Sequence, residues 1–308
     1  MKHYLVTGGC GFIGSHLCEA LLADGNRVRI LDDLSTGKLA NKPDDAELIR
    51  GDIADPACVD QALAGIDGCF HLAAIASVEK GNRDWLGTHR SNLTGAITVF
   101  DAARRAHSGT PLPVVYASSA AVYGDNPDIP LNENSTTKPL SAYGADKLGC
   151  ELHARVASHV HGVPTVGLRF FNVFGPRQDP SSHYSGVISI FADRLRAGRP
   201  VAIYGDGKQT RDFIYVGDVV AALQAAMRVM PAGSPVFNVC TGRMTSVFDV
   251  AQVIARLCGV TASIEFQPPR TGEARVSVGD PARAVSVLGT VATTTLEGGL
   301  IQLLAALG

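Results

Sequence analysis

A short apolar stretch, His3–Thr7, runs directly into a glycine-rich loop that opens a helix candidate, Phe12–Ala23. The loop reads Gly8-Gly9-Cys10-Gly11-Phe12-Ile13-Gly14 and satisfies both the G-x-x-G-x-x-G and the G-x-G-x-x-G patterns. Glycines at these places allow a tight turn, let the backbone approach a pyrophosphate, and let the helix pack closely on the strand. The positive end of the helix adds to the attraction for an anion. The loop therefore predicts a dinucleotide site with contacts from Gly8, Gly11, Phe12, Ile13 and Gly14.

The first half of the chain alternates apolar strands with helical stretches, as in a parallel sheet that is covered on both faces. The further strand candidates are Arg27–Leu31, Ala46–Ile49, Gly68–Leu72, Pro113–Ala117 and Thr165–Phe170. The further helix candidates are Pro56–Ala64, a long one from about Arg83 to His107, and Tyr143–His161.

After about residue 170 the elements shorten, and Gly, Pro and Ser cluster in the loops. We therefore expect an α/β fold: a Rossmann-type doubly wound parallel sheet in residues 1–170, with a smaller C-terminal α/β substrate-binding lobe in residues 171–308. A segment near residues 211–240 is expected to pack back on the sheet.

The second strand candidate leads into Asp32 and Asp33, some 20 residues beyond the glycine loop. A carboxylate there can accept a hydrogen bond from a ribose 2′-hydroxyl and repels a 2′-phosphate, which favours NAD over NADP. Asp32 is the better candidate, and Asp33 could serve only in loop solvation. The nearby cations Arg29 and Lys38 weaken this preference for NAD without reversing it.

Tyr143 and Lys147 are four residues apart, so they are neighbours on one face of a helix. To act as a base near pH 7, a phenol needs its pKa lowered by about 3 units, and a lysine ammonium together with an oxidised nicotinamide ring could lower it. Ser119, at the end of the preceding strand, could share a hydrogen bond with a substrate hydroxyl. The alternative is a core tyrosine beside a solvated lysine.

Composition excludes several classes of function. Lys and Arg total 27 and Asp and Glu total 29, so the net charge of −2 offers no field for holding nucleic acid or an anionic membrane. No apolar run approaches the roughly 18 residues of a membrane span, and no signal peptide precedes the first strand. The seven cysteines form no C-x-x-C pair, and the histidines lack metal-ligand spacing. We expect a cytoplasmic protein without a metal.

The sequence resembles the extended short-chain dehydrogenase/reductases, and within them the nucleotide-sugar 4-epimerases of the UDP-galactose (UDP-glucose) 4-epimerase type. The resemblance covers essentially the whole chain. It rests on the Tyr143/Lys147 pair together with Thr7–Leu17 (TGGCGFIGSHL), Gly51–Ile53 (GDI), His71–Ala74 (HLAA), Ser118–Gly124 (SSAAVYG), Leu168–Gln178 (LRFFNVFGPRQ), and Tyr204–Val216 (YGDGKQTRDFIYV) with Asp218.

The resemblance implies a tightly held NAD that acts as a transient oxidant, with Lys147 on its nicotinamide ribose. It implies cofactor contacts at Asp52 and Ile53, which would flank the adenine, and at Ala73 and Asn92, which would line the cleft. For a UDP-sugar it implies Asn172 on the sugar or diphosphate, Val187 beneath the nucleotide, Tyr204 against the uracil, Gln209 near its ribose, and Arg211 and Arg270 on the diphosphate. Taken alone, Arg211 could instead pair with Asp212, and Tyr204 could be a core aromatic residue.

Within this family, the residues favour simple 4-epimerisation through a 4-keto sugar. Ala120 and Ala121 stand where 4,6-dehydratases carry Asp-Glu and uronate decarboxylases carry Glu, and Asn172 stands where uronate 4-epimerases tend to have Thr. Ser277, seven residues beyond Arg270, stands at a position whose side-chain volume decides whether an N-acetyl group fits, unless it is an ordinary strand serine.

With Ser77, the small Ser277 favours UDP-GlcNAc and UDP-GalNAc as substrates, with UDP-Glc and UDP-Gal also accepted. A net NAD(P)H-dependent 4-keto nucleotide-sugar reductase, a UDP-uronate 4-epimerase and a non-catalytic dinucleotide-binding protein remain as alternatives. By analogy with the family we expect a homodimer that pairs the helices Arg83–His107 and Tyr143–His161.

Overall fold

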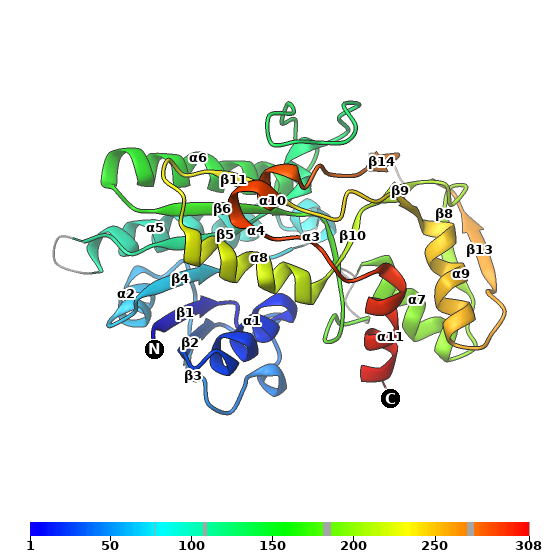
Figure 1. Ribbon diagram of the computed structural model, residues 1–308, viewed down its shortest axis with the longest axis horizontal. Helices are drawn as coiled ribbons and strands as arrows, with labels where there is room; N and C mark the ends of the chain where they lie inside the picture. Colours follow the sequence, from blue (N-terminus) through cyan, green and yellow to red (C-terminus); the bar gives the residue numbers. More distant parts are fainter. Residues whose placement is uncertain (77, 107–109, 181–185, 270–273, 308) are drawn as a thin grey trace.

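The computed structural model describes residues 1–76, 78–106, 110–180, 186–269 and 274–307. Seven strands form one sheet in the order β11-β6-β5-β4-β1-β2-β3, and every neighbouring pair is parallel (Figure 1). The strands are β1 (His3–Thr7), β2 (Arg27–Asp32), β3 (Glu47–Arg50), β4 (Gly68–His71), β5 (Val114–Ser119), β6 (Thr165–Phe170) and β11 (Val236–Val239). The strand order reverses between β1 and β4, and ligands bind at such a switch point in α/β proteins. The expected doubly wound sheet is confirmed.

Helices cover both faces of this sheet (Figure 1). One face carries α1 (Phe12–Ala23), α8 (Val216–Val229) and α10 (Ala282–Leu288), and the other carries α2 (Pro56–Leu63), α5 (Gly95–Arg105) and α6 (Ala142–His161). Because both faces are covered, a central strand is apolar along its length, and all six residues of β6 are buried. The segment that contains α8 and β11 thus packs with the large sheet.

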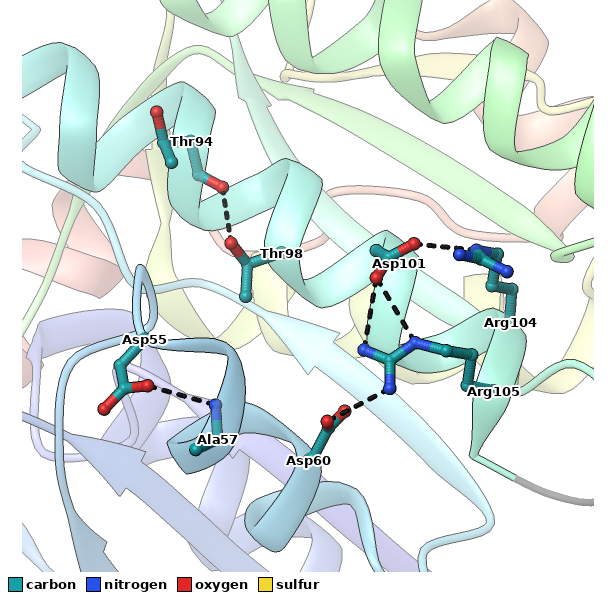
Figure 2. A network of polar contacts seen from close by, with 8 residues as sticks. All are labelled: Asp55, Ala57, Asp60, Thr94, Thr98, Asp101, Arg104 and Arg105. Carbon is teal, nitrogen blue, oxygen red and sulfur yellow. Dashed lines mark hydrogen bonds and ion pairs between the residues drawn. The ribbon is translucent and has the colours of Figure 1, made fainter.

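The α2–α5 face also has an outer layer of polar contacts (Figure 2). Arg105 of α5 donates to Asp101 on its own helix and to Asp60 on α2, the latter at 3.0 Å. Exposed ion pairs of this kind contribute about 1 kcal/mol or less to stability. The packing of α2 on α5 therefore depends on buried apolar side chains such as Val59 and Val99.

The helix expected from about Arg83 to His107 begins two residues later, at Trp85, and His107 lies outside the described residues. The structure has α3 (Val78–Arg83), α4 (Trp85–His89) and a π-helical turn η2 (Arg90–Thr94) before α5. Asp84 leaves the helical conformation, with φ −129° and ψ 76°, and its carboxylate caps α4 by accepting from the backbone N–H of Gly87. The chain therefore starts a new helix at Trp85.

The C-terminal lobe has its own apolar core, which includes Phe174, Phe191, Ile203, Val250 and Leu300. It lies at one end of the large sheet, where Figure 1 shows α7, α9 and α11 together. Its small sheets pair β10 with β7, β13 with β8, and β9 with both β12 and β14. The elements of this lobe are β7 (Asn172–Phe174), α7 (Val187–Arg196), β8 (Val201–Tyr204), β9 (Thr210–Arg211), β10 (Phe213–Tyr215), β12 (Thr245–Ser246), α9 (Val247–Leu257), β13 (Ile264–Gln267), β14 (Val276–Ser277) and α11 (Leu296–Ala306). The first half of the chain also contains two 3-10 turns, η1 (Leu39–Asn41) and η3 (Ala120–Tyr123).

Among the described ranges, no helix combines the length and the apolar character that crossing a bilayer requires. In the same part of the chain, no group of three or more His, Cys, Asp or Glu side chains could hold a metal ion.

Candidate cofactor and active site

A cavity of about 690 Å³ opens at the carboxyl ends of the central strands. Its size lies within the range of roughly 300–1,000 Å³ that is usual for ligand sites. Most of the residues expected from the sequence to touch cofactor or the reacting sugar line it: Gly8, Gly11, Phe12, Ile13, Gly14, Asp32, Asp52, Ile53, Ala73, Ser119, Tyr143, Lys147 and Asn172. The structure therefore brings the predicted dinucleotide site and the predicted catalytic residues into one cavity.

The glycine loop forms a cradle that no other residue type could form. Gly8 has a left-handed φ of 72°, and a Cβ on it would lie 2.8 Å from the backbone of Ala73. A Cβ on Gly14 would lie 2.2 Å from the carbonyl oxygen of Gly8. Helix α1 then begins with Gly11 as its N-cap, which gives no side-chain cap, so the first N–H groups of the helix face the cavity unmasked. These residues fit the diphosphate of a dinucleotide.

Asp32 ends β2 at the far side of this cradle. Its carboxylate accepts from the backbone N–H of Cys10 at 3.0 Å and from that of Leu34 at 2.8 Å. Burial raises the pKa of this carboxyl, and the two hydrogen bonds oppose the rise. A carboxylate oxygen can accept more than one hydrogen bond, so Asp32 can still receive a ribose hydroxyl. Asp33 holds its own loop, since its Oδ1 accepts from the backbone N–H of Ser35 at 2.8 Å.

The catalytic candidates come from β5 and from the first turns of α6. Helix α6 begins at Ala142 because Ser141 caps it, its Oγ accepting from the backbone N–H of Gly144 at 3.1 Å. Lys147 is buried and donates from Nζ to the carbonyl oxygen of Ala117 on β5 at 2.8 Å, while this Nζ lies 5.9 Å from the centre of the Tyr143 ring. Ser119 caps the turn after β5, its Oγ accepting from the N–H of Ala121 at 3.1 Å. The lysine is thus held on the strand and stays beside the phenol.

A buried ion pair fixes α6 to the strands that carry the site. Arg169 of β6 and Glu151 of α6 meet at 2.7 Å (Nη2–Oε2), and Ser118 of β5 donates to Glu151 Oε1 at 2.5 Å. Removing one partner of a buried pair typically costs about 3–5 kcal/mol, because the other charge stays buried. The relative positions of β5, β6 and α6 are therefore strongly determined.

Several residues expected in the site do not line this cavity. Asn92 lies behind its wall, where its carboxamide accepts from the backbone N–H of Ile75 at 2.8 Å and donates to the carbonyl of that residue at 3.2 Å. The others belong to the C-terminal lobe: Val187 begins α7, Tyr204 ends β8, Gln209 donates to the carbonyl of Tyr204, and Arg211 and Ser277 pair in register on β9 and β14. Ser77 and Arg270 lie outside the described residues.

The sequence analysis gave no role in the site to the residues that follow β7, although Arg177 and Gln178 end one of the motifs that carry the resemblance. The carbonyl oxygen of Pro176 accepts a hydrogen bond from His16 Nε2 at 3.0 Å, and Arg177 donates to Ser15 and pairs with Glu19 of α1. Gln178 lines the cavity, and its buried Oε1 has no partner in the described part of the chain, so it is an acceptor available to a ligand. Polar residues directly after a strand indicate a possible site and could have pointed to this segment. Its contacts with α1 are long-range in sequence, so local patterns do not predict them.

Comparisons with known proteins agree with this geometry. The model of the NAD dependent epimerase/dehydratase family matches residues 4–240. A UDP-glucose 4-epimerase of Mycolicibacterium smegmatis is 38% identical over 309 residues, covering 97% of this chain and 96% of that protein. The crystal structure of the Thermotoga maritima UDP-glucose 4-epimerase with UDP-glucose has a TM-score of 0.94 at 33% identity, covering 99% of this chain and 98% of that one.

A second solved structure is similar to the same extent. The UDP-N-acetylglucosamine 4-epimerase of Methanobrevibacter ruminantium M1, in complex with UDP-N-acetylmuramic acid, has a TM-score of 0.92 at 33% identity, and the match covers 99% of this chain and 98% of that one. The resemblance seen in the sequence is confirmed. The chain belongs to the NAD-dependent epimerase/dehydratase family.

Proposed function

We propose that this protein is an NAD-dependent 4-epimerase of UDP-hexoses. The observation that carries the proposal is that Ser119, Tyr143 and Lys147 line the same cavity as the glycine loop and Asp32. The 4-epimerases among its relatives support the same activity.

The residues of the cavity fit NAD. The N-terminus of α1 would take the diphosphate, Asp32 the adenosine ribose, Asp52 and Ile53 the adenine, and Lys147 the nicotinamide ribose. When bound, NAD supplies the oxidised nicotinamide that takes up hydrogen at C4 of the sugar and later returns it.

The protein's own part is to move a proton and to hold the sugar. Tyr143 accepts the proton of the 4-hydroxyl group, and Ser119 shares a hydrogen bond with that hydroxyl. The ammonium of Lys147, 5.9 Å from the ring centre, stabilises the phenolate. After the 4-keto sugar has turned over, C4 would regain its hydrogen on the opposite face, and Tyr143 would return the proton to the 4-oxygen. The net redox change is zero, so the reaction is an isomerisation.

The turn of the sugar requires an anchor that does not move, and the UDP part supplies one. On the family pattern, that anchor is held by Val187, Tyr204, Gln209, Arg211 and Arg270, with Asn172 at the cavity. A diphosphate suits forked guanidinium donors, and a base suits an aromatic face.

The substrate pair that we propose as preferred is UDP-GlcNAc and UDP-GalNAc, with UDP-Glc and UDP-Gal also accepted. Ser277 is directly beside Arg211 in the β9–β14 pairing, so a residue next to the diphosphate anchor is small. A small side chain leaves room for an N-acetyl group. The similarity to the Methanobrevibacter ruminantium UDP-N-acetylglucosamine 4-epimerase supports this preference.

The test is to give the purified full-length protein UDP-GlcNAc or UDP-Glc without added cofactor and to separate the products by chromatography. We expect UDP-GalNAc and UDP-Gal, and NAD in the supernatant of denatured protein. A strict need for added NADH or NADPH, with one cofactor oxidised per product, would instead indicate a reductase. Conversion of UDP-glucuronic acid alone would indicate a uronate 4-epimerase.

A further inference from the structure

An ion pair joins two loops at the cofactor cavity. Lys38 comes from the loop after β2, and Asp179 comes from the segment after β7. Lys38 Nζ lies 2.7 Å from Asp179 Oδ2, and both residues line the cavity. Their side chains are 59% and 30% exposed, and an ion pair this accessible contributes little to stability. Its main consequence is electrostatic: the carboxylate of Asp179 neutralises the ammonium of Lys38 inside the cavity.

Lys38 lies beside the carboxylate that is suited to the adenosine ribose. Its backbone N–H donates to the carbonyl oxygen of Cys10 at 3.0 Å, and the N–H of Cys10 donates to Asp32 Oδ2, also at 3.0 Å. A Cβ on the preceding residue, Gly37, would lie 2.9 Å from Asp32 Oδ1. The backbone of Lys38 and the carboxylate of Asp32 therefore flank the same residue, Cys10.

This location bears on the choice between NAD and NADP, which differ by a phosphate on the 2′-oxygen of the adenosine ribose. A cation near that oxygen accommodates the phosphate. Two cations near β2 were candidates from the sequence. Arg29 is turned away, since it pairs with Glu47 at 2.7 Å and donates to the carbonyls of Ala62 and Ala64. Lys38 is the one of the two that lines the cavity.

We propose that Asp179 is a specificity-determining residue that keeps the enzyme selective for NAD by occupying the ammonium of Lys38. With Asp179 in place, the pair presents no net charge to a 2′-phosphate, and Asp32 repels it. Without Asp179, Lys38 presents a full positive charge to the cavity that it lines. The selectivity for NAD then depends on two carboxylates. Asp32 binds the ribose directly, and Asp179 pairs with Lys38 so that its ammonium does not bind a 2′-phosphate.

The test measures bound cofactor and does not need turnover. Full-length wild-type protein, Asp179→Asn, Lys38→Met and the double variant are incubated with equal concentrations of NAD⁺ and NADP⁺ until the bound ratio is constant. The proteins are then desalted and denatured, and the released cofactors are quantified. Asp193→Asn, which removes the ion pair between Asp193 of α7 and Arg199, is the matched control.

Hydrogen bonds to charged groups change affinity by about tenfold or more. We therefore expect Asp179→Asn to raise the bound NADP:NAD ratio at least about tenfold, and the double variant and the control to keep the wild-type ratio. An unchanged ratio in Asp179→Asn would overturn the proposal. So would an equal rise in the double variant, because Lys38 would then have no part in it.

The inference rests on the NAD site of the proposed function but not on epimerisation. A wild-type protein that retains neither cofactor would overturn both proposals. A wild-type protein that carries NAD while Asp179→Asn keeps the wild-type ratio would overturn this one alone. If Asp179→Asn changed the total amount of retained cofactor but not the NADP:NAD ratio, the ion pair would serve only to retain the cofactor. That result would also exclude a role in specificity.

Discussion

Lys147 illustrates how the surroundings of one residue define its role. Its side chain is buried, and an ammonium with three donors must satisfy them locally. The carbonyl of Ala117 takes one donor. Within the described residues, that leaves the ammonium with donors for the phenol of Tyr143 and for a ribose hydroxyl, the two partners that the proposed chemistry requires.

Replacing Tyr143 with Phe removes one oxygen and keeps the ring. We expect turnover of UDP-sugars to fall by about 10²–10⁴-fold, the usual contribution of a positioned acid or base. The affinity for UDP-sugar, measured by calorimetry, should stay within a few-fold because the anchor residues are untouched. Turnover close to that of wild type would exclude Tyr143 as the base.

Replacing Ser277 with Tyr tests substrate preference at one position. A tyrosine suits a strand, and the strand contact of residue 277 is made by its backbone, whose carbonyl accepts from Asp212 N–H at 2.9 Å. We expect kcat/KM for UDP-GlcNAc to fall about a hundredfold relative to that for UDP-Glc, because the larger side chain would fill the space of the N-acetyl group. Ser277→Ala should leave the ratio unchanged. Equal loss on both substrates would contradict the volume argument.

At the scale of elements, helix α6 has an apolar stripe on its outer side. Leu152, Val156 and Val160 follow one another at four-residue steps and are 58%, 49% and 63% exposed. Residues at four-residue steps lie on one face of a helix. The side facing the sheet instead carries small residues such as Ala154 and Ala157. Figure 1 shows α6 on the outside of the sheet beside α5, where a second copy of the chain could cover the stripe.

We propose that two copies pair through α5 and α6, as expected by analogy from the sequence. Val156→Asp places a charge in the middle of the stripe and should shift the protein from dimer to monomer at micromolar concentration, measured by analytical ultracentrifugation. Val285→Asp, at a partly exposed valine on α10, is the control and should stay dimeric. A monomeric wild-type protein would contradict the pairing.

Local signals predicted most of the elements, because periodicity and capping depend on neighbours in sequence. The expected bounds of β1, β6 and α1 match the structure. The helix expected from about Arg83 begins at Trp85, because Asp84 caps its first turn. The part of the cavity that is lined by loops after parallel strands could be predicted, because the carboxyl ends of parallel strands lie at one edge of the sheet. Gln178 and Asp179 reach it through long-range contacts that periodicity does not encode.

At the scale of the whole molecule, a buried polar contact connects the two strands where the sheet order reverses. Thr7 Oγ1 of β1 accepts from the backbone N–H groups of Leu72 and Ala73, both at 3.2 Å, and lies 2.8 Å from His71 Nδ1 of β4. Because both N–H groups donate to Thr7 Oγ1, the hydroxyl of Thr7 donates its own proton to His71 Nδ1. Nδ1 can accept this hydrogen bond only if the imidazole of His71 is neutral. Burial, together with the charge of Lys147, lowers the pKa of His71 to about 3. Folding thus prevents this histidine from charging in mild acid.

This suppressed titration predicts how global stability depends on pH. In the unfolded chain the imidazole takes up a proton near pH 6.5, whereas in the folded chain it stays neutral down to about pH 3. Stability is therefore fully present above pH 6.5 and falls between pH 6.5 and 3, by about 1.4 kcal/mol per pH unit from this residue alone. His71→Asn can still offer an acceptor to Thr7 but cannot titrate. From pH 7 to pH 5, urea unfolding should show wild type losing about 2 kcal/mol more than the variant. Equal losses in the two proteins would mean that His71 charges in the folded state as readily as in the unfolded one.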